Sequence, residues 1–172
     1  MTLNLKDLIH AVPDFPKPGV VFRDITPMLA DGKAFAQAIE QLDEVTRDLK
    51  YTRVIGIESR GFIFGAALAL RRPCGFIPVR KPKKLPRATL RETYALEYGE
   101  DTLEMHEDAL IQGERALIVD DVLATGGTAE AAGRLVSRSA GDVAGFAFLI
   151  EIDFLSGRPR LAPHKVASLI HY

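Results

Sequence analysis

Two adjacent aspartates and the turn that follows them are the residues of this chain best suited to chemistry. Asp120 and Asp121 come directly after the apolar run 117–119, and a Thr-Gly-Gly-Thr segment occupies residues 125–128. The two glycines of this segment lack a Cβ, so the backbone there can adopt positive φ and approach an anion closely. Backbone N–H groups and two threonine hydroxyls would then converge on one point, which suits a phosphate monoester.

The two aspartates indicate what else the ligand carries. Like charges repel, so the carboxylates are not phosphate ligands themselves. Two acids beside an anion site suit a ligand with hydroxyl groups next to its phosphate, such as a ribose 5-phosphate that donates from its 2′ and 3′ hydroxyls. The segment is neither a Walker loop nor a Gly-x-Gly-x-x-Gly dinucleotide turn. An ordinary strand and helix with a solvated acidic pair is the alternative, which the Thr-Gly-Gly-Thr turn disfavours.

A second polar turn follows another apolar run. Glu58, Ser59, Arg60 and Gly61 come directly after residues 53–57. The Ser59 hydroxyl and the amides after it can donate to an anion, and the Arg60 guanidinium can pair with one through two hydrogen bonds. The N-cap of a helix would use the same residue types, so this turn alone leaves both interpretations open.

A basic run follows at residues 80–91, interrupted by Pro82 and Pro86. Its six members are Arg80, Lys81, Lys83, Lys84, Arg87 and Arg91. Such a run can neutralise a multiply charged anion, but a charge run is more often a solvated surface. We keep the solvated interpretation for three of the six, which are Lys83, Arg87 and Arg91.

The elements that must position these turns alternate between helix and strand. Helical spacing is found over residues 5–12, 35–49, 61–70 and 129–138, and strand-like apolar runs are found over 53–57, 74–79, 115–119 and 143–150. This alternation predicts an α/β fold with an open, mainly parallel, twisted sheet flanked by helices. The carboxyl ends of parallel strands meet at one edge of such a sheet, so we expect both polar turns there.

Two segments do not fit this alternation. One is the Pro-rich stretch 12–27, and the other is 81–106, which is too long and polar for a routine connection. Such segments are usually functional lids or disordered. Residues 92–99 alternate in character and could form half of a hairpin closed against residues 102–105. We therefore expect a lid within residues 81–106.

Composition narrows the class of protein but not its activity. The 172 residues are 47% hydrophobic and 26% charged with a net charge of -1, which suits one compact domain and argues against a nucleic-acid face. No apolar run approaches the ~20 residues of a membrane helix, and the first residues lack a signal-peptide pattern, so we expect a cytoplasmic protein without a membrane partner. Cys74 is the single cysteine, and the four histidines show no metal-ligand spacing.

The aspartate pair and the turn after it resemble the signature of the type I phosphoribosyltransferases, which is an apolar strand, two acidic residues and a Thr-Gly turn. The segment is most similar to members that use adenine, because Ala124 stands where the enzymes for 6-oxopurines usually carry an acid. Four motifs carry the resemblance in the family's order, from about residue 13 to residue 151. It implies one domain over residues 1–172, with a small N-terminal hood over about 1–34 and a flexible catalytic lid over about 81–106.

The resemblance also assigns phosphate groups to residues. It implies that the ribose 5-phosphate is bound by Asp120, Asp121, Ala124, Thr125, Gly126, Gly127 and Thr128. Pyrophosphate is expected at the turn after the strand 53–57, often through a strained or cis peptide. The residues implied there are Ser59, Arg60, Arg80, Lys81 and Lys84.

The resemblance places base recognition in the N-terminal stretch. The Phe22 ring offers a flat face for stacking a purine, Arg23 can donate to a ring nitrogen, and the Val21 carbonyl can accept from an exocyclic amine. That carbonyl would face the oxygen of a 6-oxopurine without a donor between them, so it favours adenine. An ordinary core position is the alternative for Phe22.

Two residues of the lid are expected to act on the base. Glu97 would accept or relay the proton that adenine loses as N9 attacks carbon 1 of the ribose, and Tyr98 would belong to the closing lid. A surface position in the hairpin is the alternative for Glu97. Asp120 and Asp121 join Glu97 as the expected catalytic residues, because they face the positive charge that develops on the ribose.

The resemblance thus implies one reaction. The 5-phosphoribosyl group of phosphoribosyl pyrophosphate would pass to N9 of adenine, giving AMP and pyrophosphate in purine salvage, with Mg²⁺ held mainly by substrate and water. The family also implies a homodimer that shares basic residues across its interface. Two alternatives stay open: transfer to a 6-oxopurine, and a non-catalytic sensor of phosphoribosyl pyrophosphate that binds nucleic acid. For the sensor, the chain shows neither an added DNA-binding domain nor a basic surface.

Overall fold

The computed structural model describes residues 2–95 and 99–172. Glu97 and Tyr98, the two lid residues that are expected to act on the base, lie outside the described residues. The chain divides into two compact units, Met1–Gln41 and Leu42–Tyr172, and the helix α2 (Gly32–Val45) crosses their boundary. In the part of the chain that is described, no helix is long and apolar enough to span a membrane.

The first unit contains a hairpin and short helices. A 3₁₀ turn at Leu5–Leu8 leads into β1 (His10–Pro13), which pairs antiparallel with β2 (Val21–Asp24), and α1 (Thr26–Ala30) follows. The prediction of a helix over residues 5–12 is therefore wrong beyond the first turn. The backbone groups of β1 find their hydrogen-bond partners in β2, and this non-local pairing outweighs the local helical spacing.

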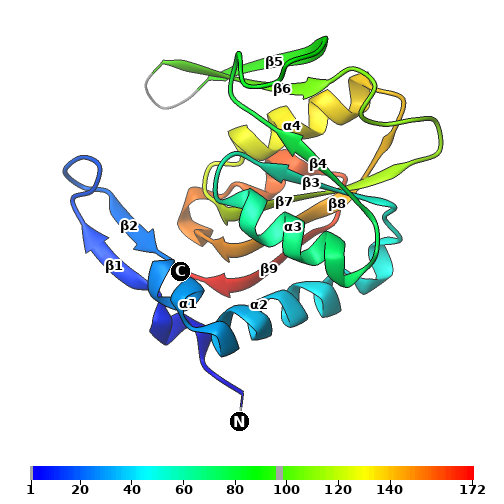
Figure 1. The fold of residues 1–172 in the computed structure, drawn as a ribbon. Helices are drawn as coiled ribbons and strands as arrows, with labels where there is room; N and C mark the ends of the chain where they lie inside the picture. The colour runs from blue at the N-terminus through cyan, green and yellow to red at the C-terminus, as the bar shows by residue number, and fades with distance from the viewer. Residues whose placement is uncertain (1, 96–98) are drawn as a thin grey trace. The chain divides into compact units, whose positions relative to one another are not determined.

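A parallel sheet of five strands forms the core of the second unit, in the order β4-β3-β7-β8-β9 (Figure 1). Its strands are β3 (Arg53–Ile57), β4 (Gly75–Val79), β7 (Arg115–Leu123), β8 (Asp142–Glu151) and β9 (Val166–His171). This arrangement confirms the predicted open parallel sheet. The edge strand β9 lies beyond the elements that the sequence predicts.

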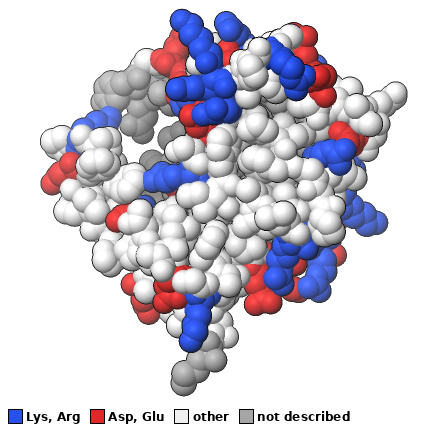
Figure 2. Space-filling model, viewed as in Figure 1, with Lys and Arg blue, Asp and Glu red and all other residues white. Residues whose placement is uncertain are grey.

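Helices cover both faces of this sheet. α3 (Gly61–Arg71) connects β3 to β4, and α4 (Gly127–Arg138) connects β7 to β8. These two crossovers run in opposite directions across the sheet, so right-handed connections place the helices on opposite faces. Leu117, Ile118 and Val119 on β7 consequently have 0% exposure. Figure 2 shows that the outer surface over α3 carries few charged side chains.

The strand β7 extends beyond its predicted end. The predicted strand 115–119 stops before the aspartates, whereas β7 continues to Leu123. The neighbouring β8 continues the pairing, with Asp120 opposite Phe148 and Leu123 opposite Glu151. The two aspartates therefore lie within the carboxyl-terminal part of a strand, where the ladder fixes their backbone.

The polar segment after β4 contains the predicted hairpin. β5 (Thr89–Ala95) pairs antiparallel with β6 (Glu100–His106). The hairpin lies beside α4 (Figure 1), where Arg134 Nε and Arg138 Nη1 donate to the Glu92 carboxylate at 2.6 and 2.9 Å. These bonds fasten one strand of the hairpin to the helix that begins at the Thr-Gly-Gly-Thr turn.

Candidate functional site

The two polar turns predicted from the sequence meet at the carboxyl edge of the sheet. Arg60, in the turn after β3, places its Nε 2.7 Å from Oδ2 of Asp121 on β7. Gly61 lies directly against β7, because a Cβ on this residue would be 2.7 Å from the Val119 carbonyl oxygen and 2.9 Å from Oδ1 of Asp120. The start of α3 therefore contacts both aspartates, and glycine is required at its first position.

The aspartate pair occupies a desolvated position. Asp121 is buried and Asp120 is partly buried, and Oδ1 of Asp120 accepts a hydrogen bond from the Asp121 amide at 2.9 Å. Burial raises the pKa of both carboxyl groups, and the charge of Asp121 raises the pKa of Asp120 further. The Arg60 guanidinium opposes the upward shift of the Asp121 pKa without reversing it. A positive charge nearby would stabilise both carboxylates, so the pair suits a ligand that becomes cationic.

The turn after the aspartates has the backbone conformation of an anion site. Gly126 has a φ of 84°, and Gly127 begins a helix of 12 residues, so the first amides of α4 point toward the turn. Residues other than glycine rarely adopt such a φ, which explains the glycine at position 126. Five of the seven residues predicted to bind the ribose 5-phosphate form this turn, and they are Ala124, Thr125, Gly126, Gly127 and Thr128.

The turn after β3 differs from an ordinary capped helix start. Arg60 is the N-cap residue of α3, and no side chain in the described part of the chain caps the helix there. Ser59 is exposed, and the Glu58–Ser59 peptide bond is cis, which agrees with the family's pattern at this turn. The missing cap and the exposed hydroxyl favour the anion-binding interpretation over the N-cap.

Glu58 accepts hydrogen bonds from two of the basic residues that are predicted to bind pyrophosphate. Its Oε2 accepts from Arg80 Nε at 3.1 Å and from the Lys81 amide at 3.0 Å. Arg80 Nη1 also donates to the Lys84 carbonyl at 3.4 Å. Burial alone would raise the pKa of Glu58, but the Lys81 amide and the Arg80 guanidinium outweigh burial and lower that pKa. The sequence assigns no role to Glu58, and its one signal is its place directly before Ser59.

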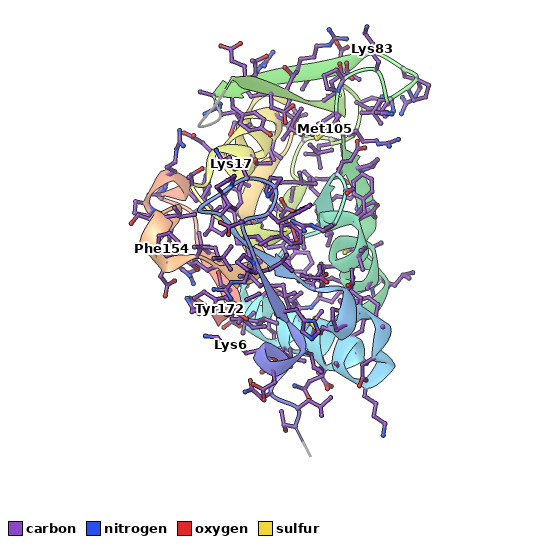
Figure 3. The ribbon with its side chains drawn as sticks, turned by 90° about the vertical axis from the view of Figure 1, so that its left-hand side faces the viewer. Lys6, Lys17, Lys83, Met105, Phe154 and Tyr172 are labelled. Carbon is purple, nitrogen blue, oxygen red and sulfur yellow. The ribbon has the colours of Figure 1, made fainter. Side chains whose placement is uncertain are left out.

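The remaining basic residues of the run lie at the surface, as predicted. Lys83, Arg87 and Arg91 are exposed, and Figure 3 shows the Lys83 side chain at the outer end of this region. Arg87 pairs with Asp108, and Arg91 Nε lies 2.7 Å from Oε1 of Glu104. These three side chains therefore belong to the lid segment and not to the sheet edge.

A chain of hydrogen bonds that the sequence does not reveal joins the hairpin to residues 124–128, which we call the phosphate turn after the ligand predicted for it. The Tyr94 hydroxyl on β5 accepts from Thr128 Oγ1 and donates to Oδ2 of Asp101 on β6, both at 3.3 Å. Asp101 also pairs with Lys81. Burial raises the pKa of Tyr94, whereas for Asp101 burial is outweighed by Lys81, which lowers the pKa. Sequence alternation places Tyr94 on one face of a strand but names none of these partners.

The residues predicted for base recognition lie on β2 of the first unit. Phe22 packs edge to face against Phe15, with ring centroids 5.2 Å apart and an interplanar angle of 74°. Phe22 is partly buried and Val21 is exposed, so neither is a fully buried core residue. The roles of Val21, Phe22 and Arg23 in binding a base stay predictions.

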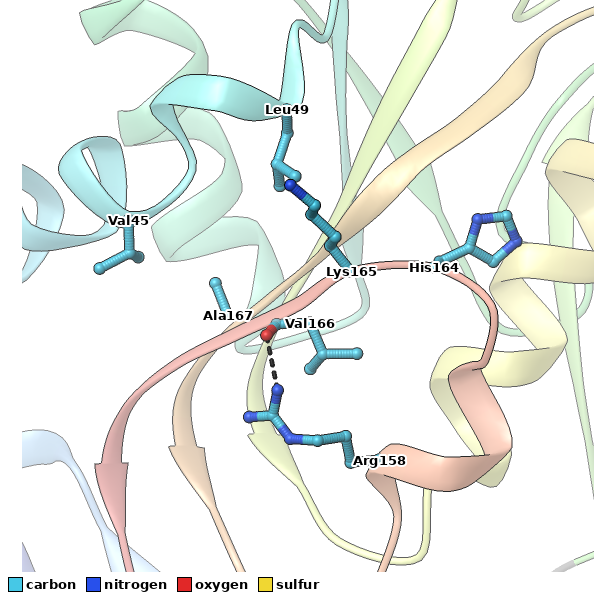
Figure 4. Close-up of a pocket in the computed structure, with 7 residues that line it drawn as sticks. All are labelled: Val45, Leu49, Arg158, His164, Lys165, Val166 and Ala167. Atoms are coloured by element: carbon cyan, nitrogen blue, oxygen red, sulfur yellow. Dashed lines mark hydrogen bonds between the residues drawn. The ribbon is translucent and has the colours of Figure 1, made fainter.

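A separate hollow lies against the amino-terminal part of β9 (Figure 4). Its volume is about 380 Å³, and it is lined by Val45, Leu49, Arg158 and residues 164–167. Figure 4 shows the Arg158 guanidinium donating to the Val166 carbonyl, at 2.7 Å. The lining contains no residue of the predicted site, so we assign the chemistry to the sheet edge and not to this hollow.

A second cluster of ligating side chains lies at the ends of β8 and β9. Glu151, Asp153 and His171 place one ligand atom each within 4.8 Å of one another. Glu151 already binds Arg158 Nε at 2.9 Å, and Asp153 binds His171 Nδ1 at 2.8 Å. Each of the three side chains therefore already has a hydrogen-bond partner within the protein.

Comparisons with known proteins agree with this geometry. Residues 25–166 match the family described as the phosphoribosyl transferase domain. The chain is 52% identical over 172 residues to the adenine phosphoribosyltransferase of Myxococcus xanthus (strain DK1622), a match that covers 100% of this chain and 94% of that relative. It is 57% identical over 169 residues to the adenine phosphoribosyltransferase of Solibacter usitatus (strain Ellin6076), with 98% of each chain covered.

A solved structure gives the same result. The adenine phosphoribosyltransferase of Thermoanaerobacter pseudethanolicus ATCC 33223 is 49% identical and has a TM-score of 0.96, with 98% of both chains covered. The parallel sheet, its two polar turns and the domain match define a phosphoribosyltransferase. Within that class, the chain belongs to the adenine phosphoribosyltransferase family.

Proposed function

We propose that this protein transfers the 5-phosphoribosyl group of phosphoribosyl pyrophosphate to N9 of adenine, giving AMP and pyrophosphate for purine salvage. The contact between Arg60 and Asp121 carries the proposal, because it joins an anion-binding turn to carboxylates that can accept from ribose hydroxyls. Adenine is the base named for the relatives at 52% and 57% identity. We take residues 1–172 as one catalytic domain, with residues 1–34 as its hood and 81–106 as its lid.

The aspartates act on the ribose in this proposal. As the bond from carbon 1 to pyrophosphate lengthens, positive charge grows on the ribose and negative charge grows on the leaving group. Asp120 and Asp121 accept hydrogen bonds from the 2′ and 3′ hydroxyls and face the developing cation. Because burial raises the pKa of both groups, a nearby cation gains more from them than it would from solvated carboxylates.

The basic residues act on the leaving group. Ser59 and the amides after it donate to pyrophosphate, and Arg60 exchanges part of its contact with Asp121 for the anion. Arg80, Lys81 and Lys84 neutralise the remaining charge. The bonds from Glu58 to Arg80 and to the Lys81 amide support this role, because they hold both residues beside the turn.

The hood and lid act on the base. Phe22 stacks on adenine, Arg23 donates to a ring nitrogen, and the Val21 carbonyl accepts from the exocyclic amine. Glu97 accepts or relays the proton that adenine loses as N9 attacks carbon 1 of the ribose. Closure of the lid, which includes Tyr98, excludes the water that could intercept the ribose cation.

We include Mg²⁺ as the cofactor, held mainly by substrate oxygens and water. Oxygen donors suit this ion, and the sheet edge offers two carboxylates. Asp121 already pairs with Arg60, and Asp120 accepts from a backbone amide, so the pair is poorly arranged to enclose an ion by itself. When bound, the ion would neutralise charge on the pyrophosphate.

We further propose a cytoplasmic homodimer. Ile63 and Leu70 lie seven residues apart on one face of α3 and are 37% and 83% exposed. Figure 2 shows the mainly uncharged surface over this helix, and an exposed apolar face of this kind suits an interface. A partner there could share Arg80, Lys81 and Lys84 between two sites. The free Cys74 suits the reducing environment of the cytoplasm. Light scattering of the protein in solution tests whether it is a dimer.

The experiment that tests the function is AMP production from adenine, phosphoribosyl pyrophosphate and Mg²⁺. Hypoxanthine, guanine and a sample without base are run in parallel. AMP formed from adenine alone supports the proposal, and product from a 6-oxopurine alone would reassign the base. Saturable binding of phosphoribosyl pyrophosphate without turnover on any base would identify a sensor instead.

A further inference from the structure

The connection between β8 and β9 runs back against the phosphate turn. It contains the short helices η3 (Asp153–Leu155) and η4 (Arg158–Leu161), with Gly157 between them. A Cβ on Gly157 would overlap the Ala124 carbonyl oxygen and lie 2.9 Å from the Gly126 nitrogen. A Cβ on Gly126 would in turn lie 2.7 Å from the Gly157 carbonyl oxygen. Two backbones therefore touch at this point with no side chain between them.

This contact falls on the atoms that shape the phosphate turn. Ala124 and Gly126 flank Thr125, and Gly126 has the positive φ that turns the chain into α4. Backbone atoms cannot rotate out of the way as a flexible side chain can. A side chain at position 157 would therefore displace either the turn or the connection behind it.

The connection is itself fastened by the two arginines that follow Gly157. Arg158 Nε donates to Oε1 of Glu151 on β8 at 2.9 Å, and Arg158 Nη1 donates to the Val166 carbonyl at 2.7 Å (Figure 4). Arg160 Nε lies 3.2 Å from Oε2 of Glu130 on α4. Burial would raise the pKa of Glu151, but Arg158 and Ser168 outweigh burial and lower it. These bonds hold the connection in place, so an atom added at position 157 would displace the turn and not the connection.

We propose that Gly157 is a positioning residue for the phosphate turn, an inference that rests on the proposed function of that turn. It fixes Ala124 and Gly126 in the conformation that binds the 5′-phosphate, and it acts through the turn without contacting the ligand. A side chain at position 157 weakens recognition of the ribose 5-phosphate group and leaves recognition of the base unchanged.

The test compares Gly157→Ala with a matched glycine variant. A Cβ on Gly141 would lie 3.1 Å from the Glu114 carbonyl oxygen, at the amino end of β8 and away from the turn. Gly157→Ala should raise the Kd of ribose 5-phosphate, measured by calorimetry, and the KM of phosphoribosyl pyrophosphate by about tenfold or more. The KM of adenine should change by less than about twofold. Gly141→Ala should lower the thermal midpoint with both phosphate constants unchanged.

A second variant covers the case in which Gly157→Ala does not fold. Arg158→Lys keeps the positive charge but loses the planar fork that holds Glu151, so it loosens the connection without adding an atom at position 157. It should raise the Kd of ribose 5-phosphate by about threefold. If Gly157→Ala folds and binds ribose 5-phosphate with the wild-type Kd, the inference is overturned. If Gly157→Ala does not fold, a wild-type Kd for Arg158→Lys overturns it.

The same measurements separate this inference from the proposed function. Wild-type protein that makes no AMP, but whose ribose 5-phosphate binding is lost in Gly157→Ala, would overturn the function and keep the positioning role. If wild-type protein makes AMP and Gly157→Ala binds ribose 5-phosphate with the wild-type Kd, the proposed function is kept and the positioning role is overturned.

Discussion

The sheet edge and the lid segment hold their functional groups by different means. At the edge, backbone contacts set the geometry, since Gly61 lies against β7 and Gly157 lies against the phosphate turn. In residues 81–106, long side chains are held by carboxylates, as Lys81 is by Asp101. Ion pairs at partly exposed positions exchange far more easily than packed backbone does.

This difference separates two tasks. The phosphate group of ribose 5-phosphate is a rigid tetrahedron, so in the proposed function a rigid turn can recognise it without rearrangement. Pyrophosphate arrives and leaves as a highly charged group, and side chains in ion pairs can exchange their partners for it at little cost. The comparison therefore predicts large effects on turnover at the edge and more selective effects in the lid.

Asp121→Asn is expected to give the largest effect and to test the edge directly. The amide keeps the shape of the side chain but removes the charge that faces the ribose, so turnover should fall by about 10³-fold. The thermal midpoint should stay close to that of the wild type. Asp48→Asn, at an exposed position in η2 (Arg47–Leu49), is the control and should leave turnover unchanged. Unchanged turnover in Asp121→Asn would remove its role.

Glu97→Gln tests the lid and should follow in size. The glutamine cannot accept a proton from adenine, so kcat should fall by about 10²-fold while adenine binding weakens far less. Glu100→Gln, at an exposed position at the start of β6, is the control. Equal losses in turnover and in adenine binding would show that Glu97 only contacts the base.

Glu58→Gln breaks the link between edge and lid. Losing the charge that holds Arg80 and the Lys81 amide should raise the KM of phosphoribosyl pyrophosphate by about tenfold, or roughly 1.4 kcal/mol, with a smaller change in kcat. Glu44→Gln removes an ion pair with Arg47 in which both side chains are more than half exposed, and should change neither constant. A fall in kcat alone would mean that Glu58 does not act through pyrophosphate binding.

Asp120→Asn should lower turnover, as Asp121→Asn does, but its effect on stability is the smallest of the expected changes and is an increase. The folded pKa of Asp120 is above its ordinary value of 3.8, so its contribution to stability is complete below that pH and is lost as the pH rises through the folded pKa. Above its folded pKa the ionised group therefore destabilises the fold, and asparagine should raise the thermal midpoint there by about 2–4 °C.

The gain from Asp120→Asn should shrink as the pH is lowered toward 4, which thermal unfolding at several pH values would measure. Asp108 offers a control of opposite sign, because Arg87 lowers its pKa and asparagine there removes a favourable charge. An equal shift at every pH would show that packing, and not charge, explains the result at Asp120.

The sequence predicts which residues meet at the sheet edge better than it predicts the contacts that support them. Asp120, Asp121 and the Thr-Gly-Gly-Thr turn could be found because their requirements are local: a charge, a hydroxyl, and a backbone free of Cβ atoms. Arg60 could be placed beside them because parallel strands bring their carboxyl ends together.

The supporting residues could not be found in this way, because their roles depend on distant partners. Glu58 binds a guanidinium 22 positions along the chain, and Tyr94 binds a hydroxyl 34 positions away. The helix predicted over residues 5–12 fails for the same reason, since pairing between β1 and β2 decides the outcome. The extension of β7 past residue 119 likewise depends on β8 beside it.

The position of Gly157 has a consequence for the newly made chain. A ribosome completes the aspartate pair and the phosphate turn well before it adds the connection that backs them. Until residues 157–171 have emerged, β8 has no β9 beside it and presents an open edge, and the turn lacks the backbone that fixes its shape. We expect a nascent chain that ends at β8 to contain both aspartates proposed to be catalytic and still not bind a sugar phosphate.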